Sequence, residues 1–451
     1  MSETPCQSPV HLIIAELSRS VDALELGVPP LFIERSGVAL HQALASRARE
    51  FHTHQHALDL CVGADPLETI AALYHDTVYV QVDLGLPEHF AGLLAPLIRK
   101  EPAGWRVLPH AGVDLVARDV LAVFGRAPDE VLTPLAGLNE LASAFVVVKE
   151  FEGLMTRPQL LALAAAIEGT IPFREDQGSA LEGRLLRLGI PGPDAAEMVR
   201  RAVRLSNSDV GNFAHPDPSF FLDNTWKLLP ETNPALHTAS TYTVRDYRVA
   251  LEKMEGFLAQ LKPERVFRCW GGEPSAQEHA RRVEVARSNI ALAVRYLRCK
   301  LYSSALVEAL ASESGGDGPL EYFMGGIPEP GGAPVVRIES FLPPPARPQP
   351  GDPLLLRLLE GGRVTASSFD IAPSPIASYL CVALGEPAMM EGLTLARLWW
   401  GGERSARDFL EAQPRDVVFA LAEAASHVAV TRSGALQALL QLMAQGHPPK
   451  P

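Results

Sequence analysis

Residues 51 to 79, FHTHQHALDLCVGADPLETIAALYHDTVY, carry four of the thirteen histidines of the chain and an adjacent His-Asp pair. A segment that must hold several imidazoles and a carboxylate in fixed positions can adopt few structures, so this segment constrains the fold most. His52 and His56 stand four apart, which places both on one face of a predicted helix. A second helix is predicted to begin at residues 65–68, DPLE, which supply an N-cap, a proline at the first helical position and a glutamate at the third.

That second helix is expected to end at His75 and Asp76, and His56 comes from the helix before it. Neutral imidazole nitrogens and carboxylate oxygens hold hard and borderline divalent metals, so these three side chains form a partial metal shell that lacks one ligand. The best candidate for the missing ligand is Asp209 in RAVRLSNSDVGNFAHPD, where a predicted helix over residues 195–205 ends in a polar turn. The alternative role for Asp209 is to stabilise that turn through local hydrogen bonds.

Three short motifs in this part of the chain resemble those of the HD-domain superfamily, a group of metal-dependent phosphohydrolases. The resemblance spans about residues 35 to 215, under half of the chain, and rests on three stretches: FHT and HALD within residues 51–59, LYHDTVY over residues 73–79, and NSDVG over residues 207–211. Many HD hydrolases have a lysine shortly after the His-Asp pair, whereas this chain has Tyr79 near that place. The resemblance therefore leaves the substrate class open.

The resemblance implies that His56, His75, Asp76 and Asp209 bind one divalent ion, either Mn, Mg, Ni, Co, Fe or Zn. It also implies an HD-like helical array around that ion. His52 matches the histidine that cyclic-nucleotide phosphodiesterases of this superfamily use to protonate the leaving oxygen. The same position suits a histidine that only orients a bound water, so both roles stay open for His52.

The composition and charge are those of a globular protein that does not bind polyanions over its general surface. The chain has 451 residues, of which 47% are hydrophobic and 21% charged, which is enough for two or three domains. Its formal net charge of −13 argues against nucleic acid and anionic membranes as partners. A local basic pocket for a small phosphorylated molecule is still compatible with that charge.

The cysteine usage and the first residues predict a cytoplasmic protein. The five cysteines show no CxxC and no paired spacing, so we expect reduced thiols: Cys6, Cys61, Cys269, Cys299 and Cys381. The opening stretch, MSETPCQSPVHLIIAELSRS, has no basic region before its apolar run, and that run is too short for a signal or membrane segment.

Apolar residues recur at helical spacing over most of the chain, so we predict a mostly α fold. The expected helices in the HD-like part lie over residues 87–98, 113–124, 137–155, 156–168 and 179–188, with residues 99–112 irregular between them. The pattern continues over residues 219–229, 244–261 and a long run from 275 towards 311. With no break in composition, residues 1–312 are interpreted as one HD-like helical domain with an extension.

Glycine and proline crowd residues 313–353, which predicts a linker with one short strand over residues 335–341. Beyond it, alternation in LLLRLLEGGRVTASSFDI predicts a hairpin closed around Gly361 and Gly362, followed by short helices. Residues 354–451 are therefore expected to form a small α+β C-terminal domain. They contain no motif that points to a particular chemistry.

Several residues between the His-Asp pair and Asp209 are further candidates. Glu168 ends a predicted helix, where it would either accept a hydrogen bond from a metal-bound water or simply cap the helix. Lys149 and Arg174 are the basic residues nearest that region in sequence and are candidate phosphate contacts. His89 and His110 are the histidines available there for a second metal, although nothing in their spacing pairs them.

Together these residues predict hydrolysis of a small phosphate ester, with nucleotides among the candidate substrates, at a metal-bound water with a histidine as proton donor. One alternative is an HD-type di-iron oxygenase, which would need His89 and His110 as extra ligands. The other is a non-catalytic regulatory protein whose helical pocket binds a nucleotide or a metal.

Overall fold

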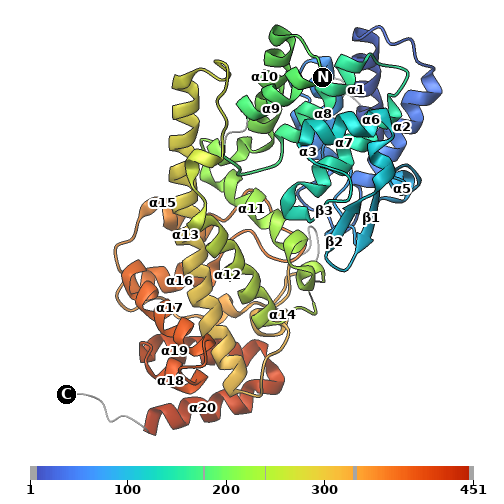
Figure 1. The fold of residues 1–451 in the computed structure, drawn as a ribbon. Coiled ribbons are helices and arrows are strands. Elements are labelled where there is room, and N and C mark those ends of the chain that lie inside the picture. Colours follow the sequence, from blue (N-terminus) through green and yellow to red (C-terminus); the bar gives the residue numbers. More distant parts are fainter. Residues whose placement is uncertain (1–7, 176–177, 239, 329–332, 446–451) are drawn as a thin grey trace, which may run out of the picture. The chain divides into compact units, whose positions relative to one another are not determined.

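The computed structural model describes residues 8–175, 178–238, 240–328 and 333–445, with only the backbone described at residues 110 and 135 (Figure 1). Over these residues the chain forms 20 α-helices and one small three-stranded sheet, so the predicted mostly α fold is confirmed. The chain divides into two compact units. Unit 1 comprises Met1–Ala214 and Lys262–Arg287, and unit 2 comprises His215–Leu261 and Ser288–Pro451.

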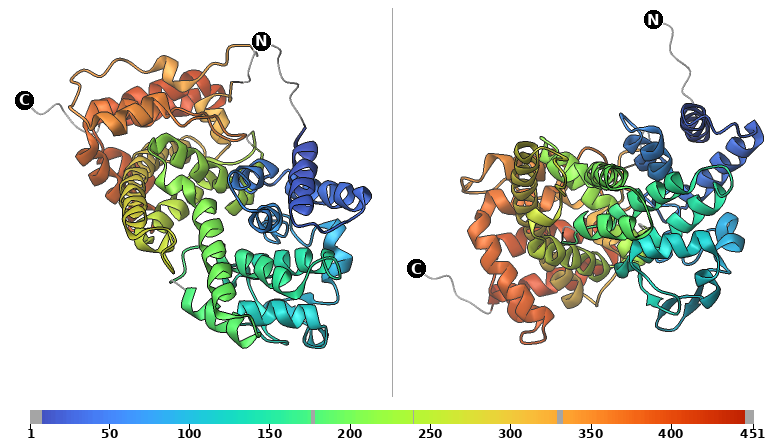
Figure 2. Two further views of the ribbon diagram at one scale, coloured as in Figure 1. Left: turned by 90° about the horizontal axis from the view of Figure 1, so that it is seen from above. Right: turned by 45° about the horizontal axis from the view of Figure 1, so that its top comes forward.

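Unit 1 holds the first ten helices of the chain. Their bounds are α1 Pro9–Ala23, α2 Pro30–Leu44, α3 His54–Leu60, α4 Pro66–Tyr74, α5 Glu88–Leu94, α6 Leu115–Phe124, α7 Leu138–Glu150, α8 Arg157–Gly169, α9 Gly178–Arg187 and α10 Gly192–Asp209. Helices α1 and α2 lie side by side (Figure 2). Most of these helices follow the predicted ranges to within a turn, because their apolar spacing is regular.

Helix α8 lies at the centre of unit 1, where it packs against α4, α6, α7 and α10. Every residue from Leu160 to Gly169 is buried, so this helix is covered on all sides. A helix that is apolar all round, as in LLALAAAIEG, is stable only in such a position. Its first turn is closed by a capping box between Thr156 and Gln159, and Thr156 is the predicted N-cap.

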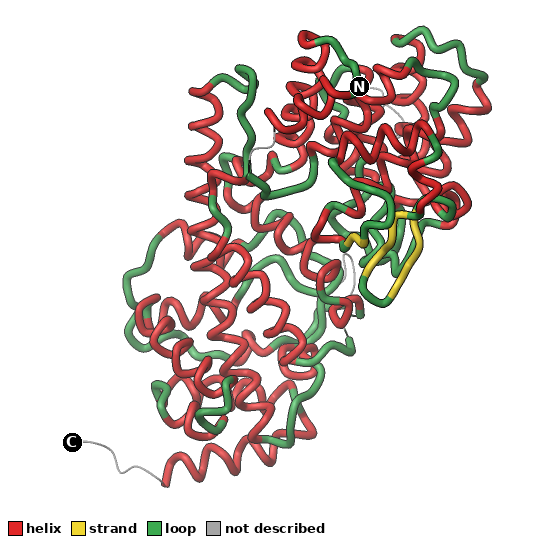
Figure 3. The backbone as a smooth tube through the Cα atoms, in the orientation of Figure 1, coloured by secondary structure: helices red, strands yellow, loops and turns green. Residues whose placement is uncertain are grey.

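The sheet of unit 1 was missed by the sequence prediction, which had residues 99–112 as irregular. Strands β1 Ile98–Glu101, β2 Gly104–Val107 and β3 Val131–Leu132 pair antiparallel in the order β1-β2-β3 (Figure 3). Ile98 faces Val107 across the first pair. Strands of two to four residues are too short to show alternation, so only the turn residues around them stand out in the sequence.

Unit 2 is built from the helices that follow. Their bounds are α11 Pro218–Thr232, α12 Val244–Gln260, α14 Leu320–Met324, α15 Pro353–Gly361, α16 Pro375–Leu384, α17 Glu386–Trp400, α18 Ala406–Glu411, α19 Arg415–Val428 and α20 Ser433–Gln445. Helix α13, Ala276–Glu313, begins in unit 1 and continues in unit 2. None of the described helices combines the length and the apolar composition that a membrane crossing requires.

Two predictions in the C-terminal part were wrong. The strand expected over residues 335–341 is a 3-10 turn over Ile338–Phe341, and the hairpin expected around Gly361 and Gly362 is replaced by helix α15. Asp352 caps α15 by accepting hydrogen bonds from two backbone N–H groups, and the leucines at 355, 358 and 359 are buried at helical spacing. No strand is described beyond residue 132, so the expected β part of this region is absent from the described residues. The predicted domains 1–312 and 354–451 with a linker over 313–353 stay a prediction.

Candidate metal centre

Helix α4 holds His75 in place because both of its ends are fixed. At its start, the Asp65 side chain accepts from two backbone N–H groups and Glu68 completes the capping box, as predicted. The guanidinium of Arg201 lies 2.8 Å from the Asp65 carboxylate. The helix is buried from Glu68 to Tyr74, and His75 is its C-cap. The His-Asp pair therefore stands at a helix end, as the sequence predicts.

Helix α10 carries Asp209, and it runs one turn further than predicted. Asp209 is its last helical residue, whereas the sequence prediction ended the helix at residue 205. The end of α10 is tied down by Asn207, whose amide donates to the Arg268 carbonyl at 2.9 Å and accepts from the Arg268 N–H at 2.8 Å. A buried amide with both groups paired holds the end of the helix in one position.

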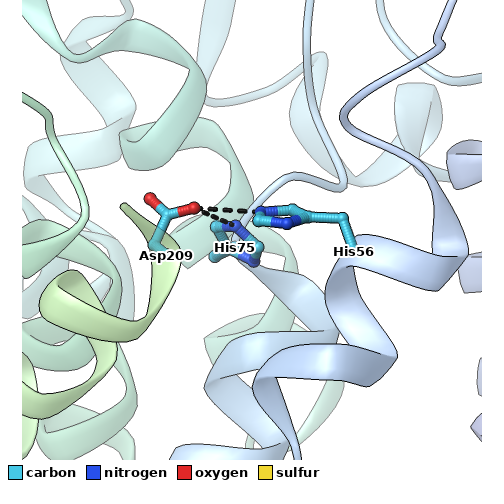
Figure 4. A group of neighbouring side chains, drawn as sticks. All are labelled: His56, His75 and Asp209. Atoms are coloured by element: carbon cyan, nitrogen blue, oxygen red, sulfur yellow. Dashed lines mark hydrogen bonds and ion pairs between the residues drawn. The ribbon is translucent and has the colours of Figure 1, made fainter. Parts of the chain in front are cut away.

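Four side chains from these segments meet. Asp209 Oδ1 lies 2.9 Å from His56 Nε2 and 3.7 Å from His75 Nε2. Asp76 Oδ2 lies 2.8 Å from His75 Nε2 and 3.8 Å from His56 Nε2. Figure 4 shows His56, His75 and Asp209 converging from three separate segments. The structure therefore brings together all four residues predicted as metal ligands.

The buried atoms of this cluster fit a divalent cation. His75 Nδ1 lies 2.7 Å from the Ala72 carbonyl oxygen, which can only accept, so Nδ1 carries a proton. In the neutral imidazole, Nε2 then has its lone pair facing the cluster. His75 Nε2 and Asp76 Oδ2 are both buried without a hydrogen-bond partner among the described residues, although they lie 2.8 Å apart. Buried atoms of this kind are typical of metal ligands.

The charges in the cluster favour a cation. Burial by itself would lower the pKa of His75, but the carboxylates of Asp76 and Asp209 outweigh it and raise that pKa well above its usual value. Burial would likewise raise the pKa of Asp209, yet His56 and His75 bring it down to about 2. Two ionised carboxylates thus hold a proton on His75 that a metal ion would displace.

His52 lies beside the cluster but not on the predicted helix. Helix α3 begins at His54 with Thr53 as N-cap, so the expectation that His52 and His56 share one helical face was wrong. The ring of His52 packs edge-on against Tyr79, with their centroids 4.5 Å apart. Burial would raise the pKa of Asp76, but the charge of His75 and then that of His52 lower it.

Arg49 is a positioning residue that the sequence prediction missed. Its buried guanidinium donates to the backbone carbonyls of His52 at 3.2 Å and Asp76 at 2.6 Å, and it pairs with the Asp83 carboxylate. A single side chain therefore fixes the backbone at two residues of the site. No local motif marks Arg49, because its partners lie up to 34 residues away.

Glu140, on α7, is a second residue that was missed. Its Oε2 atom is buried and has no hydrogen-bond partner among the described residues. Burial, together with the charges of Asp76 and Asp209, raises the pKa of Glu140 to about 7, although Arg174 acts in the opposite direction. Nothing in the sequence marks this residue, because a glutamate in the first turn of a helix is ordinary.

The three other predicted site residues, Glu168, Lys149 and Arg174, are all engaged in ion pairs. Glu168 is almost fully buried and pairs with Arg184 at 2.8 Å and Arg174 at 3.1 Å. The Lys149 ammonium lies between Asp114 and Glu152. These partners give Glu168 and Lys149 a structural role, and their predicted roles in the site stay predictions. Arg174 differs from these two residues because its charge lowers the pKa of Glu140.

Of the two histidines proposed for a second metal, His89 is the one whose side chain the structure describes. His89 borders a groove formed with Glu34, Arg35 and Glu150. The side chain of His110 lies outside what the structure describes. Within the described residues, the ligand atoms close enough for a metal are those of His56, His75 and Asp209, which Asp76 completes.

No known protein-family model, curated protein or solved structure matches the chain. The likeness to HD-domain hydrolases therefore stays a prediction that rests on the three sequence motifs.

Proposed function

We propose that unit 1 is a hydrolase of small phosphate esters that binds one divalent ion through His56, His75, Asp76 and Asp209. The observation that carries this proposal is the pair of buried atoms without partners, His75 Nε2 and Asp76 Oδ2, beside Asp209 and His56. Two neutral imidazoles and two carboxylates balance the charge of a divalent cation. They also leave coordination positions for water and substrate.

The residues around the ion have separate tasks. When bound, the ion would lower the pKa of a coordinated water and stabilise negative charge on phosphoryl oxygens. His52, whose charge acts on Asp76 and whose ring lies edge-on to that of His56, would give a proton to the leaving oxygen. Glu140, with a pKa of about 7, exchanges a proton near neutral pH, which suits a group that takes the proton of the attacking water. Arg49 holds the backbone of both His52 and Asp76 in place.

Arg174 supports a phosphate ester as the substrate. It is the cation whose charge acts on Glu140, and its Nε atom is buried without a hydrogen-bond partner among the described residues. A guanidinium whose charge acts on Glu140 would offset part of the repulsion that a phosphate meets at the carboxylates of the site. This keeps Arg174 as the predicted phosphate contact.

The test combines metal analysis with a substrate panel. Purified protein is assayed for bound metal and for hydrolysis of phosphomonoesters, phosphodiesters and nucleotides with added Mn, Ni, Co or Mg. His56→Ala and His75→Ala are compared with His54→Ala. His54 is a matched control because it lies on the same helix as His56 and its ring faces His41, with centroids 5.5 Å apart.

We expect turnover with at least one metal, lost in both ligand variants and kept in the control. Turnover that survives His75→Ala would refute the proposed metal site. Iron bound in pairs without phosphatase activity would favour the oxygenase instead, and binding of metal or nucleotide without any turnover would favour a regulatory protein.

A further inference from the structure

Unit 2 contains a cavity, distinct from the candidate metal centre, whose walls carry unusual polar groups. Its polar lining includes Lys300, Ser303 and Ser304 from α13, Arg337, and Asp370, among apolar side chains. The cavity volume, counted as the space that the centre of a water molecule can occupy, is about 40 Å³. One buried water needs about 10 to 15 Å³ by this measure, so the cavity has room for a group the size of a carboxylate or phosphate.

The charge buried around the cavity is positive in excess. Asp370 Oδ2 lies 2.9 Å from Lys300 Nζ and 3.8 Å from an Arg363 nitrogen. The same oxygen accepts from Trp226 Nε1 at 2.9 Å and from the Tyr247 hydroxyl at 2.6 Å. One carboxylate thus faces two buried cations and has its charge fully engaged. Arg363 does not itself line the cavity, but it shares the Asp370 carboxylate with Lys300, so an anion entering beside Lys300 would balance the second positive charge.

Arg337 adds no net charge to the cavity. Its guanidinium donates to Glu339 at 2.7 Å and to the carbonyls of Gly325 and Gly326 at 3.0 and 2.7 Å. The excess of one positive charge therefore comes from Lys300 and Arg363.

The start of helix α16 also borders the cavity. Pro375, Ile376 and Ala377 line it, and they are the first three residues of this ten-residue helix. Ser374, the N-cap, makes no side-chain hydrogen bond to the helix, and its hydroxyl instead pairs with the Tyr296 hydroxyl at 2.7 Å. The first N–H groups of a helix carry partial positive charge and bind anions when no side chain caps them.

Ser304 supplies the second, independent sign of a ligand. It is only 6% exposed and lines the cavity, yet its hydroxyl has no hydrogen-bond partner among the described residues. It stands four residues after Lys300 on α13, so both face the same side of that helix. Its neighbour Ser303 also lines the cavity, but its hydroxyl donates to the Lys300 carbonyl at 2.8 Å.

We propose that unit 2 binds a small organic acid, whose carboxylate or phosphate group is held by Ser304, Lys300 and the first N–H groups of α16. The apolar part of the ligand contacts Val307, Leu320 and Ile371, which also line the cavity. This binding site is separate from the proposed hydrolase site and does not depend on it.

The experiment measures how anions shift thermal unfolding of the full chain. Sodium butyrate and sodium phosphate are titrated separately at an ionic strength held constant with sodium chloride, and the apparent Kd is taken from the rise in Tm. Wild type, Ser304→Ala and the matched control Ser303→Ala are compared. The two serines are adjacent, nearly buried and both line the cavity. Each substitution therefore removes one hydroxyl oxygen from the same cavity wall.

We expect one of the two anions to raise Tm, with a Kd about tenfold weaker in Ser304→Ala, the size expected for one lost hydrogen bond to a charged group. Ser303→Ala should bind like wild type, because its hydroxyl is already used within α13. A response to butyrate alone identifies a carboxylate ligand, and a response to phosphate alone a phosphate ligand. If neither anion raises Tm, or if Ser304→Ala binds as tightly as wild type, the proposal is overturned.

Discussion

Asp209 Oδ1 lies 2.9 Å from His56 Nε2, although 153 residues separate them in the chain. Helix α10 packs against α8, and its last residue is Asp209. This packing brings Asp209 to His56. The contact joins two half-buried groups. Burial would raise the pKa of Asp209, but His56 and His75 lower it to about 2. A carboxylate that stays ionised at neutral pH beside two imidazoles is a ligand ready for a cation.

We predict that Asp209→Asn weakens metal affinity by at least about 100-fold, because changes outside the ligands alone cost 10 to 100-fold. The amide keeps the shape but removes one of the two negative charges that offset the cation. Metal affinity is measured by competition with a fluorescent chelator. Asp59→Asn is the control, since Asp59 is an exposed carboxylate on α3 that accepts from Gln55.

Arg49→Lys should weaken metal binding by about 10 to 100-fold without removing any ligand. A lysine cannot donate at once to the carbonyls of His52 and Asp76 and to the Asp83 carboxylate, as Arg49 does. The variant should also have a free energy of unfolding lower by about 2 to 4 kcal/mol, because a buried hydrogen-bonded charge loses partners. Denaturant unfolding measures this difference.

Two measurements separate positioning from general destabilisation in this variant. Metal affinity is determined well below the unfolding transition, so that the chain is folded throughout. Arg47→Lys, two residues away on an exposed side chain, should change neither affinity nor stability. Unchanged metal affinity in folded Arg49→Lys would show that Arg49 serves the fold alone.

The sequence pointed to most of the side chains that meet in the cluster because their spacing is local and chemically distinctive. His75 and Asp76 follow a helix whose capping residues can be read directly, and the structure has that helix as predicted. Asp209 was predicted from the polar turn at the end of a helix and from the motif resemblance, because its distance from His56 in the chain hides the contact. Arg49 and Glu140 were missed, since what distinguishes them is burial and charge in the folded chain, which a single sequence does not show.

The same reasoning explains the failures in the fold. The segment LLLRLLEGG has leucines that suit a helix and glycines that suit a hairpin turn, and the glycines were given too much weight. In the structure, Asp352 starts a helix there and Gly362, with a φ of 82°, ends it. The short strands around Gly104 were missed because each has at most four residues.

Glu140→Gln should remove a pH dependence of stability near neutrality. Burial, aided by Asp76 and Asp209, raises the pKa of Glu140 from 4.5 to about 7, so the folded chain holds this proton more tightly than the unfolded chain. Its contribution to stability is therefore complete below about pH 4.5 and is lost as pH rises through about 7.

The difference in unfolding free energy between Glu140→Gln and wild type should then change by about 1 to 3 kcal/mol across this range, in favour of the variant at higher pH. Denaturant unfolding at several pH values measures it, with Glu34→Gln, an exposed glutamate, as the control. In the proposed hydrolase, the activity of wild type should change with pH around pH 7, and the activity of Glu140→Gln should not show this change. Parallel stability curves for variant and wild type would contradict the raised pKa.

Asp370→Asn should destabilise unit 2 by about 3 to 5 kcal/mol, the cost of leaving a buried cation without its partner. Asp370 Oδ2 accepts from Trp226, Tyr247 and Lys300, and an amide oxygen keeps the geometry but not the charge. Lys300 and Arg363 would then be two buried cations facing each other without a carboxylate. The measurement is denaturant unfolding, with Glu391→Gln on the exposed side of α17 as control.

The sign of the pH dependence provides an independent check on this network. Burial would raise the pKa of Asp370, but Lys300 and Arg363 reverse that and lower it below its usual value. Its stabilisation is therefore present above the ordinary carboxyl pKa and is lost as pH falls through the lowered one. Wild type should thus lose stability on acidification below about pH 4, a loss that Asp370→Asn shows to a smaller degree. Equal acid sensitivity in the two proteins would mean that Asp370 is not ionised in the folded chain.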